Sequence, residues 1–359
     1  MKVALLSPIA WRTPPRHYGP WERVVSLLAE GLVKNGIDLT LFATGDSKTA
    51  GRLDYMAPFP YEENPNLDPK VWECLHIAHL FEQAHNFDII HNHYDFLPLS
   101  YSRLVDTPML TTIHGFSSSK ILPAYREYNR DNYYVSISDA DRSPDLNYLA
   151  TVYHGIDLNE FTLREEPGEY LLYFGRIHPD KGTAEAIQIA SRSGMPLYIA
   201  GIIQDKDYFN QRVSPFIDNK KVIYLGSVGP DKRDELLGKA FALLHPIYFN
   251  EPFGLSVIEA NACGTPVIAF NKGSMTEVVK DGESGFLADN VQMAFEQLSK
   301  VPLLNRKKCR QWVEKRFSQE RMVRDYINLY EEILASEPKM NDVCYPDISS
   351  ITLHFPLNS

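Results

Sequence analysis

Residues 245–277 read HPIYFNEPFGLSVIEANACGTPVIAFNKGSMTE and combine a strand end, a loop, a helix and a second strand. Apolar Leu255, Ile258 and Ala262 recur at intervals of three and four, which predicts a helix through them. The apolar run over 266–270 is continuous rather than alternating, as expected for a parallel strand buried on both faces. This order of elements indicates an α/β protein built on parallel sheets.

Two carboxylates, Glu251 and Glu259, lie eight positions apart on either side of the predicted start of this helix. The backbone N–H groups of Phe253, Gly254 and Leu255 would point out of the helix N-terminus, where an anion is favoured. Either glutamate alone is explained as well by solvation, or by capping and pairing within its own segment. Together they suit a ligand that carries both hydroxyls and phosphates, such as a sugar nucleotide.

At this point the chain resembles the retaining glycosyltransferases of family 4, whose signature is a glutamate, seven residues and a second glutamate. Glu251 and Glu259 match that spacing. The resemblance implies the GT-B fold, in which two facing Rossmann-like domains, each a doubly wound parallel sheet, enclose a cleft. It also implies that Glu251 contacts the hydroxyls of the donor sugar and that Glu259 binds the hydroxyls of the ribose.

Length and composition indicate a globular protein of two domains, because 359 residues are many for a single core. The N-terminal apolar run ends at Pro8 and is too short for a signal peptide, so we expect a cytoplasmic protein. Four cysteines without paired spacing argue against disulfides and a zinc knuckle. A net charge of −10 argues against nucleic acid as the main partner, and it weakens, without excluding, peripheral contact with an anionic membrane.

Short apolar runs alternate with helical patterns, and the alternation restarts after a polar segment at 157–169. The expected strands are 2–6, 37–42, 88–91, 109–113, 133–137 and 151–154 in the first half, and 170–174, 196–200, 221–225, 242–245 and 266–270 in the second. We therefore predict an N-terminal acceptor-binding domain over 1–160 and a C-terminal nucleotide-sugar-binding domain over 161–318. A helix over 319–335 follows, and the resemblance implies that it crosses back to the N-terminal domain, although its apolar stripe also suits its own domain. No structure is predicted for 336–359.

The second informative motif is LYFGRIHPDKG at 172–182, where a strand ends at Gly175 and a loop presents Arg176 and Lys181. Doubly wound sheets bind ligands at the carboxyl ends of their strands, and an arginine with a lysine suits a diphosphate. A solvated basic loop is the general alternative. The resemblance extends to this segment and implies that Gly175, Arg176 and Lys181 belong to the diphosphate clamp. Neither Gly-x-Gly-x-x-Gly nor a Walker loop occurs, which argues against a nicotinamide dehydrogenase or a P-loop enzyme.

The loop between the first strand and the first helix contains Arg16, His17, Tyr18, Gly19 and Pro20. Gly19 lets the backbone approach a ligand closely, and Pro20 suits the first turn of a helix. The resembled family usually has two adjacent glycines here, so Pro20 removes one backbone N–H donor. The resemblance implies that Gly19 contacts the donor and that Arg16, His17 and Tyr18 contact the acceptor. The alternative is a well-capped helix start without a binding role.

His114 follows an apolar run and precedes a glycine, which places it at the ligand-binding edge of the predicted sheet, although lone histidines are more often structural. The resemblance implies that His114 faces the donor sugar and acts with Arg176, Lys181 and Glu251 in catalysis.

His91, His93 and Asp95 would share one face of a strand in a pattern that suits a metal ion. Because the strand is expected to end at His91 and no fourth ligand follows, we predict no metal and no cofactor.

Ser227 and Val228 follow another predicted strand and form a candidate loop for contacting the nucleotide base. The resemblance places Glu277 in a segment used around the sugar and phosphates, but capping of a helix explains that residue equally well. The donor-binding set is therefore Gly19, Gly175, Arg176, Lys181, Ser227, Val228, Glu251, Phe253, Gly254, Leu255 and Glu259.

These motifs predict a retaining, metal-independent glycosyltransferase that moves a hexosyl unit from a nucleoside diphosphate sugar to an acceptor. The donor would be a UDP- or GDP-sugar, and the acceptor a glycan, a lipid-linked sugar or a small molecule. Two alternatives share the architecture: a sugar-nucleotide epimerase, which would act without an acceptor, and a non-catalytic protein that binds nucleotide sugars without turnover.

Overall fold

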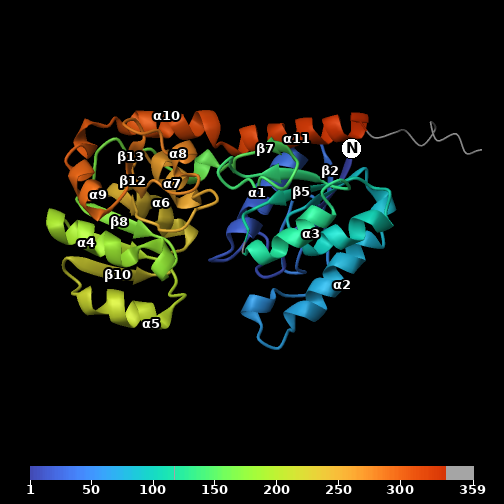
Figure 1. The fold of residues 1–359 in the computed structure, drawn as a ribbon, viewed down its shortest axis with the longest axis horizontal. Coiled ribbons are helices and arrows are strands. Elements are labelled where there is room, and N and C mark those ends of the chain that lie inside the picture. Colours follow the sequence, from blue (N-terminus) through green and yellow to red (C-terminus); the bar gives the residue numbers. More distant parts are fainter. Residues whose placement is uncertain (117, 337–359) are drawn as a thin grey trace, which may run out of the picture.

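The computed structural model describes residues 1–116 and 118–336, which form two α/β domains, each with helices on both faces of a parallel sheet (Figure 1). Within these residues the N-terminal sheet has seven strands in the order β3-β2-β1-β4-β5-β6-β7, and the C-terminal sheet has six in the order β10-β9-β8-β11-β12-β13. Neighbouring strands are parallel throughout. The arrangement confirms the predicted fold class of two doubly wound sheets.

The strands of the N-terminal sheet are β1 (Lys2–Leu6), β2 (Asp38–Phe42), β3 (Arg52–Asp54), β4 (Ile89–Asn92), β5 (Met109–Ile113), β6 (Tyr133–Ser136) and β7 (Tyr148–Thr151). Those of the C-terminal sheet are β8 (Tyr170–Phe174), β9 (Leu197–Ala200), β10 (Val222–Gly226), β11 (Ala240–His245), β12 (Val267–Phe270) and β13 (Gly285–Ala288). The helices are α1 (Pro20–Lys34), α2 (Pro69–Phe81), α3 (Leu122–Glu127), α4 (Thr183–Ser193), α5 (Lys206–Tyr208), α6 (Pro230–Gly238), α7 (Leu255–Ala262), α8 (Met275–Val278), α9 (Val291–Leu298), α10 (Arg306–Arg316) and α11 (Gln319–Ser336).

The sequence analysis missed the edge strands β3 and β13, and the predicted strands agree with the structure to within two residues at each end, except at β7. That strand lies three residues earlier than the predicted 151–154. The apolar run misled the prediction because its later part leaves the sheet. Val152 packs in the core of the N-terminal domain and Ile156 in that of the C-terminal domain, so this segment is apolar because it joins two cores.

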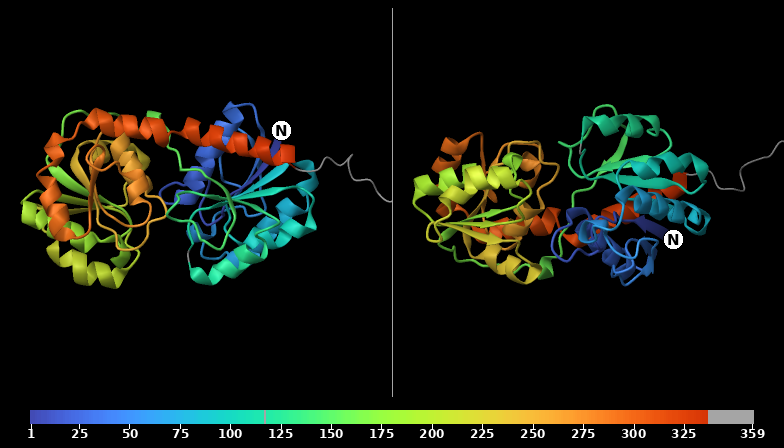
Figure 2. Two further views of the ribbon diagram at one scale, coloured as in Figure 1. Left: turned by 45° about the horizontal axis from the view of Figure 1, so that its top comes forward. Right: turned by 90° about the horizontal axis from the view of Figure 1, so that it is seen from below.

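The long helix α11 runs along the N-terminal domain beyond α10, so the chain crosses the molecule a second time (Figures 1 and 2). Its apolar stripe packs on α1 and the sheet behind it, in one core with Val3, Leu5 and Leu28. Ser318 caps the helix, because its Oγ accepts a hydrogen bond from the backbone N–H of Arg321 at 3.2 Å. In the described part of the chain, no helix combines the length and apolar character needed to cross a membrane.

The two segments that pass between the domains lie side by side. The backbone N–H of Ile156 donates to the carbonyl of Phe317 at 2.9 Å, and the N–H of Gln319 donates to the carbonyl of Ile156 at 3.0 Å. Ile156 therefore pairs with Ser318 in a short parallel bridge. This bridge fixes both crossings at one place and leaves the carboxyl ends of the two sheets on either side of a cleft.

Candidate active site

A cleft of about 840 Å³ lies between the two domains. Loops after β1, β4 and β5 line one side, and loops after β8, β10 and β11 line the other. The predicted site residues that line it are His17, Tyr18, Gly19, His114, Gly175, Arg176, Lys181, Ser227, Val228, Glu251, Phe253, Gly254, Leu255 and Glu259. Motifs that are distant in the sequence therefore converge on one cavity.

Arg16 is the one predicted site residue that does not line the cleft. Its guanidinium points to the other side of the loop, where it pairs with Asp46 at 2.8 Å and with Glu63. These two carboxylates hold the loop against β2 and the segment before α2. In this arrangement Arg16 links the loop to these two segments.

The basic loop after β8 and the acidic loop after β11 meet at the centre of the C-terminal side. Lys181 Nζ lies 2.6 Å from Glu251 Oε2, and both side chains are largely buried. The ammonium also lies 4.4 Å from the centre of the Phe249 ring. Arg176 lines the same cavity and donates a hydrogen bond to the side-chain amide of Gln204. The two predicted motifs thus build one charged centre.

Helix α7 begins where the sequence predicts. Gly254 is its N-cap, with φ of +96°, and a side chain there would meet Met275 Cε at 2.7 Å. Only glycine satisfies both conditions without strain. The first N–H groups of α7 then face the cleft, beside Glu251.

Glu259 lies one turn inside α7 and is 3% exposed. Two arginines from opposite domains approach it: Arg233 Nη1 lies 3.4 Å from Glu259 Oε1, and Arg23 Nε lies 3.8 Å from the same atom. Both arginines also pair with the more exposed Glu160. Glu259 is therefore held at the floor of the cleft by a network that spans the two domains.

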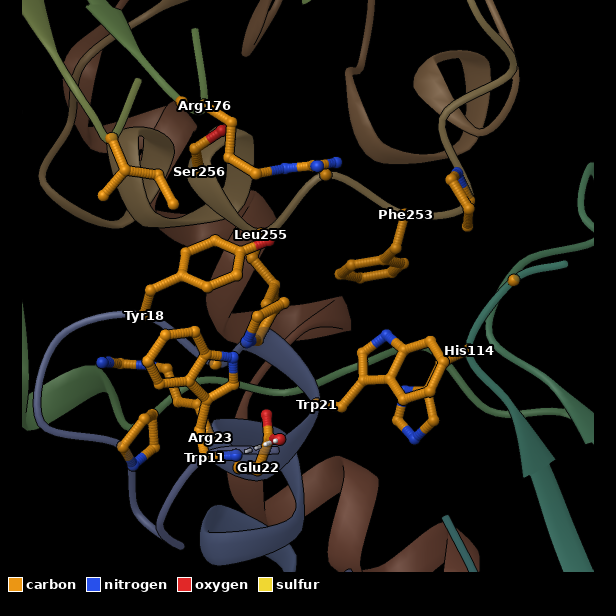
Figure 3. A pocket seen from close by; sticks show the side chains of 18 of the residues that line it. Trp11, Tyr18, Trp21, Glu22, Arg23, His114, Arg176, Phe253, Leu255 and Ser256 are labelled. Atoms are coloured by element: carbon orange, nitrogen blue, oxygen red, sulfur yellow. Dashed lines mark hydrogen bonds between the residues drawn. The ribbon is translucent and has the colours of Figure 1, made fainter. Parts of the chain in front are cut away.

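His114 is buried at the end of β5, with its ring stacked on Trp21 at 5.1 Å between centroids (Figure 3). Its Nε2 lies 2.8 Å from His93 Nδ1, and its Nδ1 lies 3.3 Å from His154 Nε2. Both ring nitrogens are thus engaged by other histidines. A hydrogen bond from His114 to a donor hydroxyl, as the family resemblance implies, requires one of these contacts to be given up.

The residues His91, His93 and Asp95 do not point to a common position. His91 bonds Tyr330 at 2.6 Å and Thr112 at 2.8 Å, toward α11. His93 bonds His114, and Asp95 accepts a hydrogen bond from Tyr125. In residues 1–116 and 118–336, no group of three or more His, Cys, Asp or Glu side chains is arranged so that it could hold a metal ion. The pattern that suggests a metal site in the sequence is a set of separate structural contacts.

The loop between β1 and α1 approaches the C-terminal domain. Tyr18 extends toward Arg176, and Trp11 contacts Tyr18 edge to face at 6.0 Å (Figure 3). Gly19 has φ of +147°, and a side chain there would meet the carboxylate of Glu22 at 2.9 Å. Pro20 is the first residue of α1, so the missing N–H belongs to a turn that has no intrahelical acceptor.

Sequence reasoning missed Glu22, which lines the cleft on the first turn of α1 and is 3% exposed. One carboxylate oxygen accepts the backbone N–H of Trp11 at 3.2 Å, and burial raises the pKa of Glu22 to about 7. In a sequence, an acidic residue at a helix start is already explained by its favourable interaction with the helix dipole, so it does not stand out as a site residue. The signal that distinguishes it is its position two residues after Pro20, in the loop and helix start at the carboxyl edge of the sheet.

Glu277 lies outside the cleft and joins the domains. Its carboxylate accepts the backbone N–H groups of Asp139 at 2.9 Å and Ala140 at 2.8 Å, and the hydroxyl of Tyr153 at 2.9 Å. Nearby, Ser138 Oγ donates to the carbonyl of Pro252 at 2.7 Å. The hydrogen bonds of Glu277 and of Ser138 therefore hold the two domains together beside the cleft.

Comparison with known proteins bears on this geometry. Residues 157–319 match the family model described as glycosyl transferases group 1, and residues 21–143 match the model described as glycosyltransferase family 4. The chain is 26% identical over 336 residues to a glycogen synthase of Mycobacterium tuberculosis, covering 77% of this chain and 80% of that protein. It is 25% identical over 325 residues to a D-inositol 3-phosphate glycosyltransferase of Paenarthrobacter aurescens, covering 74% and 79% of the two chains.

Solved structures share the architecture. The sucrose-phosphate synthase of Thermosynechococcus elongatus superposes with a TM-score of 0.76 at 18% identity, covering 94% of this chain and all of the other. HepE of Anabaena, solved in complex with UDP and glucose, superposes with a TM-score of 0.74 at 18% identity, covering 92% of this chain and all of HepE. These structures show the GT-B fold. The two family models, which together span most of the chain, show that it belongs to the glycosyltransferases of group 1 and family 4.

Proposed function

We propose that the protein is a retaining glycosyltransferase that takes a hexosyl unit from a nucleoside diphosphate sugar. The observation that carries this proposal is the meeting of Lys181, Glu251 and Arg176 at the start of α7. Two cations, a carboxylate and a helix N-terminus in one cleft match the needs of a ligand with a diphosphate and a sugar.

In the proposed donor site, Arg176 and Lys181 hold the diphosphate, Glu251 the sugar hydroxyls and Glu259 the ribose. The loop at Ser227 and Val228 then contacts the base. UDP-glucose is supported as the first donor to test because HepE, which shares the fold, has been solved with UDP and glucose and with UDP-glucose.

In the proposed reaction, the bond between the anomeric carbon and the leaving diphosphate oxygen breaks as the acceptor hydroxyl bonds to the same face of that carbon. The acceptor proton passes to the departing phosphate. Fixed cations stabilise the charge that grows on the diphosphate, which is a transition-state effect. We propose that Arg176 and Lys181 supply this charge, so the reaction needs no metal ion.

The first test is the melting temperature of the full chain with UDP, GDP and ADP, each with and without EDTA. We expect one nucleotide to raise it by several degrees, since a ligand that binds only the folded state stabilises it. The chelator should leave that rise unchanged. A flat response to all three nucleotides would contradict the donor site.

A second test uses Lys181→Ala, with Lys239→Ala as the matched control. Lys239 is an exposed lysine of the same domain, paired only with Glu235. Loss of one charge that stabilises the transition state typically reduces turnover on the order of a hundredfold, while the Lys239 variant should keep wild-type activity. Release of nucleoside diphosphate measures turnover, and circular dichroism checks folding. Binding without turnover in the wild type would favour the non-catalytic alternative, and sugar isomerisation without an acceptor would favour the epimerase.

A further inference from the structure

The side of the cleft that the N-terminal domain contributes has its own chemistry. We call it the N-terminal wall and define it by Trp11, Tyr18, Trp21, Glu22, Glu73 and Asp95, all of which line the cleft. The set combines flat aromatic rings with carboxylates. The C-terminal side differs, because there each carboxylate faces a lysine or an arginine.

The rings of the N-terminal wall form surfaces that a sugar can pack against. Trp11 and Tyr18 are partly exposed in the cleft and meet edge to face at 6.0 Å, so their contact covers only one face of one of the two rings. Trp21 is different, because His114 already stacks on it. The C–H groups on one face of a pyranose ring are apolar and suit such aromatic faces, which supply area at little entropic cost.

The three carboxylates of the N-terminal wall accept hydrogen bonds from neutral groups only, within the described residues. Glu22 accepts the Trp11 backbone N–H, Glu73 accepts the hydroxyl of Tyr61 at 3.2 Å, and Asp95 accepts that of Tyr125. Burial raises the pKa of Asp95 to about 6, as it does that of Glu22 to about 7. Each carboxylate has two oxygens, so capacity remains for the donors of a ligand.

Basic side chains of the same domain do not balance these carboxylates. Arg16 lies outside the cleft and is paired twice. Arg23 lines the cleft but pairs with Glu160 and approaches Glu259. His17 also lines the N-terminal side of the cleft, and its imidazole is exposed. Among the described residues, the N-terminal side of the cleft therefore offers a phosphate these carboxylates but no unpaired arginine or lysine. Like charges brought together cost several kcal/mol.

We propose that the N-terminal wall binds an acceptor sugar that carries no phosphate or carboxylate group. The apolar face of the sugar packs on Trp11 and Tyr18, and its hydroxyl or amino groups donate hydrogen bonds to the three carboxylates. The proposal rests on the proposed function, because the cleft has an acceptor side only if the opposite side holds the donor.

The experiment uses the full chain, saturated with whichever nucleotide raises its melting temperature. Glucose, mannose and galactose are titrated in matched neutral, 2-amino and 6-phosphate forms, with their disaccharides, while tryptophan fluorescence reports on Trp11 and Trp21. Release of nucleoside diphosphate from the donor, above its slow hydrolysis, measures transfer. We expect a neutral or amino form to bind at least about tenfold more tightly than its 6-phosphate, the effect of one charge repulsion. Equal or tighter binding of the phosphate forms, or no binding of any neutral or amino sugar, would overturn the proposal.

Variants of the N-terminal wall test acceptor binding independently of donor binding. Glu22→Gln should raise the acceptor KM about tenfold, as loss of a charged hydrogen-bond acceptor does, and leave the nucleotide Kd within about twofold. Glu62→Gln is the control, because Glu62 is exposed and does not line the cleft. If Glu22→Gln does not fold, Trp11→Ala tests the stacking surface with the same two readouts. An unchanged acceptor KM in both variants would refute the site, whereas loss of nucleotide binding in the wild type would refute the proposed function instead.

Discussion

At the scale of single residues, buried histidines should set the acid stability of the protein. The described chain buries His76, His91, His93, His114, His154 and His245. Burial lowers the pKa of all six, to about 4 in His76 and His245 and to about 3 in His114. Because unfolding lets them bind protons below their ordinary pKa of about 6.5, stability should fall as pH drops below that value. Three carboxyls, of which Glu22 is buried and Asp95 and Asp141 are partly buried, act in the opposite direction, since burial raises the pKa of Glu22 and Asp141 to about 7 and of Asp95 to about 6. Their stabilisation is complete below about pH 4 and lost as pH rises toward 7.

Six histidines take up protons on unfolding and only three carboxyls release them. The melting temperature should therefore be highest near pH 7 to 8 and fall steeply between pH 6.5 and 5. Urea titrations across this range give the free energy of unfolding at each pH. His76→Gln should reduce the slope of that free energy against pH by the equivalent of about one proton. His85→Gln is the control, because His85 is exposed, and it should leave the slope unchanged. Greater stability at pH 5.5 than at pH 7.5 would show that the carboxyls dominate.

Residue positions were predictable from sequence where a motif supplied the spacing. Glu251, Glu259 and Lys181 could be placed in one cleft because the glutamates flank a helix start and the basic loop ends a strand. Glu22 and the partners of Glu277 could not, because their surroundings come from segments far away in the chain. Burial of Glu22 depends on the packing of Trp11, and the amides that Glu277 binds belong to the other domain.

At the scale of elements, the packing of α11 on α1 depends on a glycine. A side chain at Gly31 of α1 would meet Val323 Cγ2 of α11 at 2.3 Å. Helix propensity alone predicts that Gly31→Ala stabilises α1 by about 1 kcal/mol, but overpacking predicts a loss of about 1–3 kcal/mol. We expect the loss, and we expect the Gly31→Ala, Val323→Ala pair to be less destabilised than the sum of its single changes. Urea denaturation of the four proteins measures this coupling, and a stabilising Gly31→Ala would mean that α11 does not pack here.

The apolar stripe of α11 illustrates what an element's sequence leaves open. The spacing of Met322, Tyr326 and Tyr330 predicts a buried face but does not say which domain covers it. The structure gives the partner: Tyr330 bonds His91 and Tyr326 bonds Thr112, both on strands of the N-terminal sheet. Such long-range pairs arise from topology, so periodicity alone cannot supply them.

At the scale of the whole molecule, activity should depend on contacts that set the angle between the domains. Glu277 of the C-terminal domain accepts two hydrogen bonds from backbone N–H groups of the N-terminal domain and one from Tyr153 of the connecting segment, all away from the cleft. The proposed donor contacts lie mainly on one domain and the acceptor contacts on the other. Loosening the link should therefore spare donor binding and impair the alignment of the reacting atoms, which is sensitive to shifts of about 1 Å.

We expect Glu277→Ala to lower kcat by about tenfold or more, since misplacement by about 1 Å can cost a hundredfold. The nucleotide Kd, measured by calorimetry, should stay within about twofold of the wild type. Glu283→Ala is the control, because Glu283 belongs to the same domain and forms an ion pair with Lys280 at the surface. Small-angle scattering with bound nucleotide should show a broader distribution of domain distances in the Glu277 variant and not in the control. An equal loss of nucleotide affinity and turnover would place the effect of Glu277 in the stability of the C-terminal domain. Unchanged kcat would mean that the remaining contacts between the domains, including the bridge at Ile156 and Ser318, are sufficient to set the domain angle.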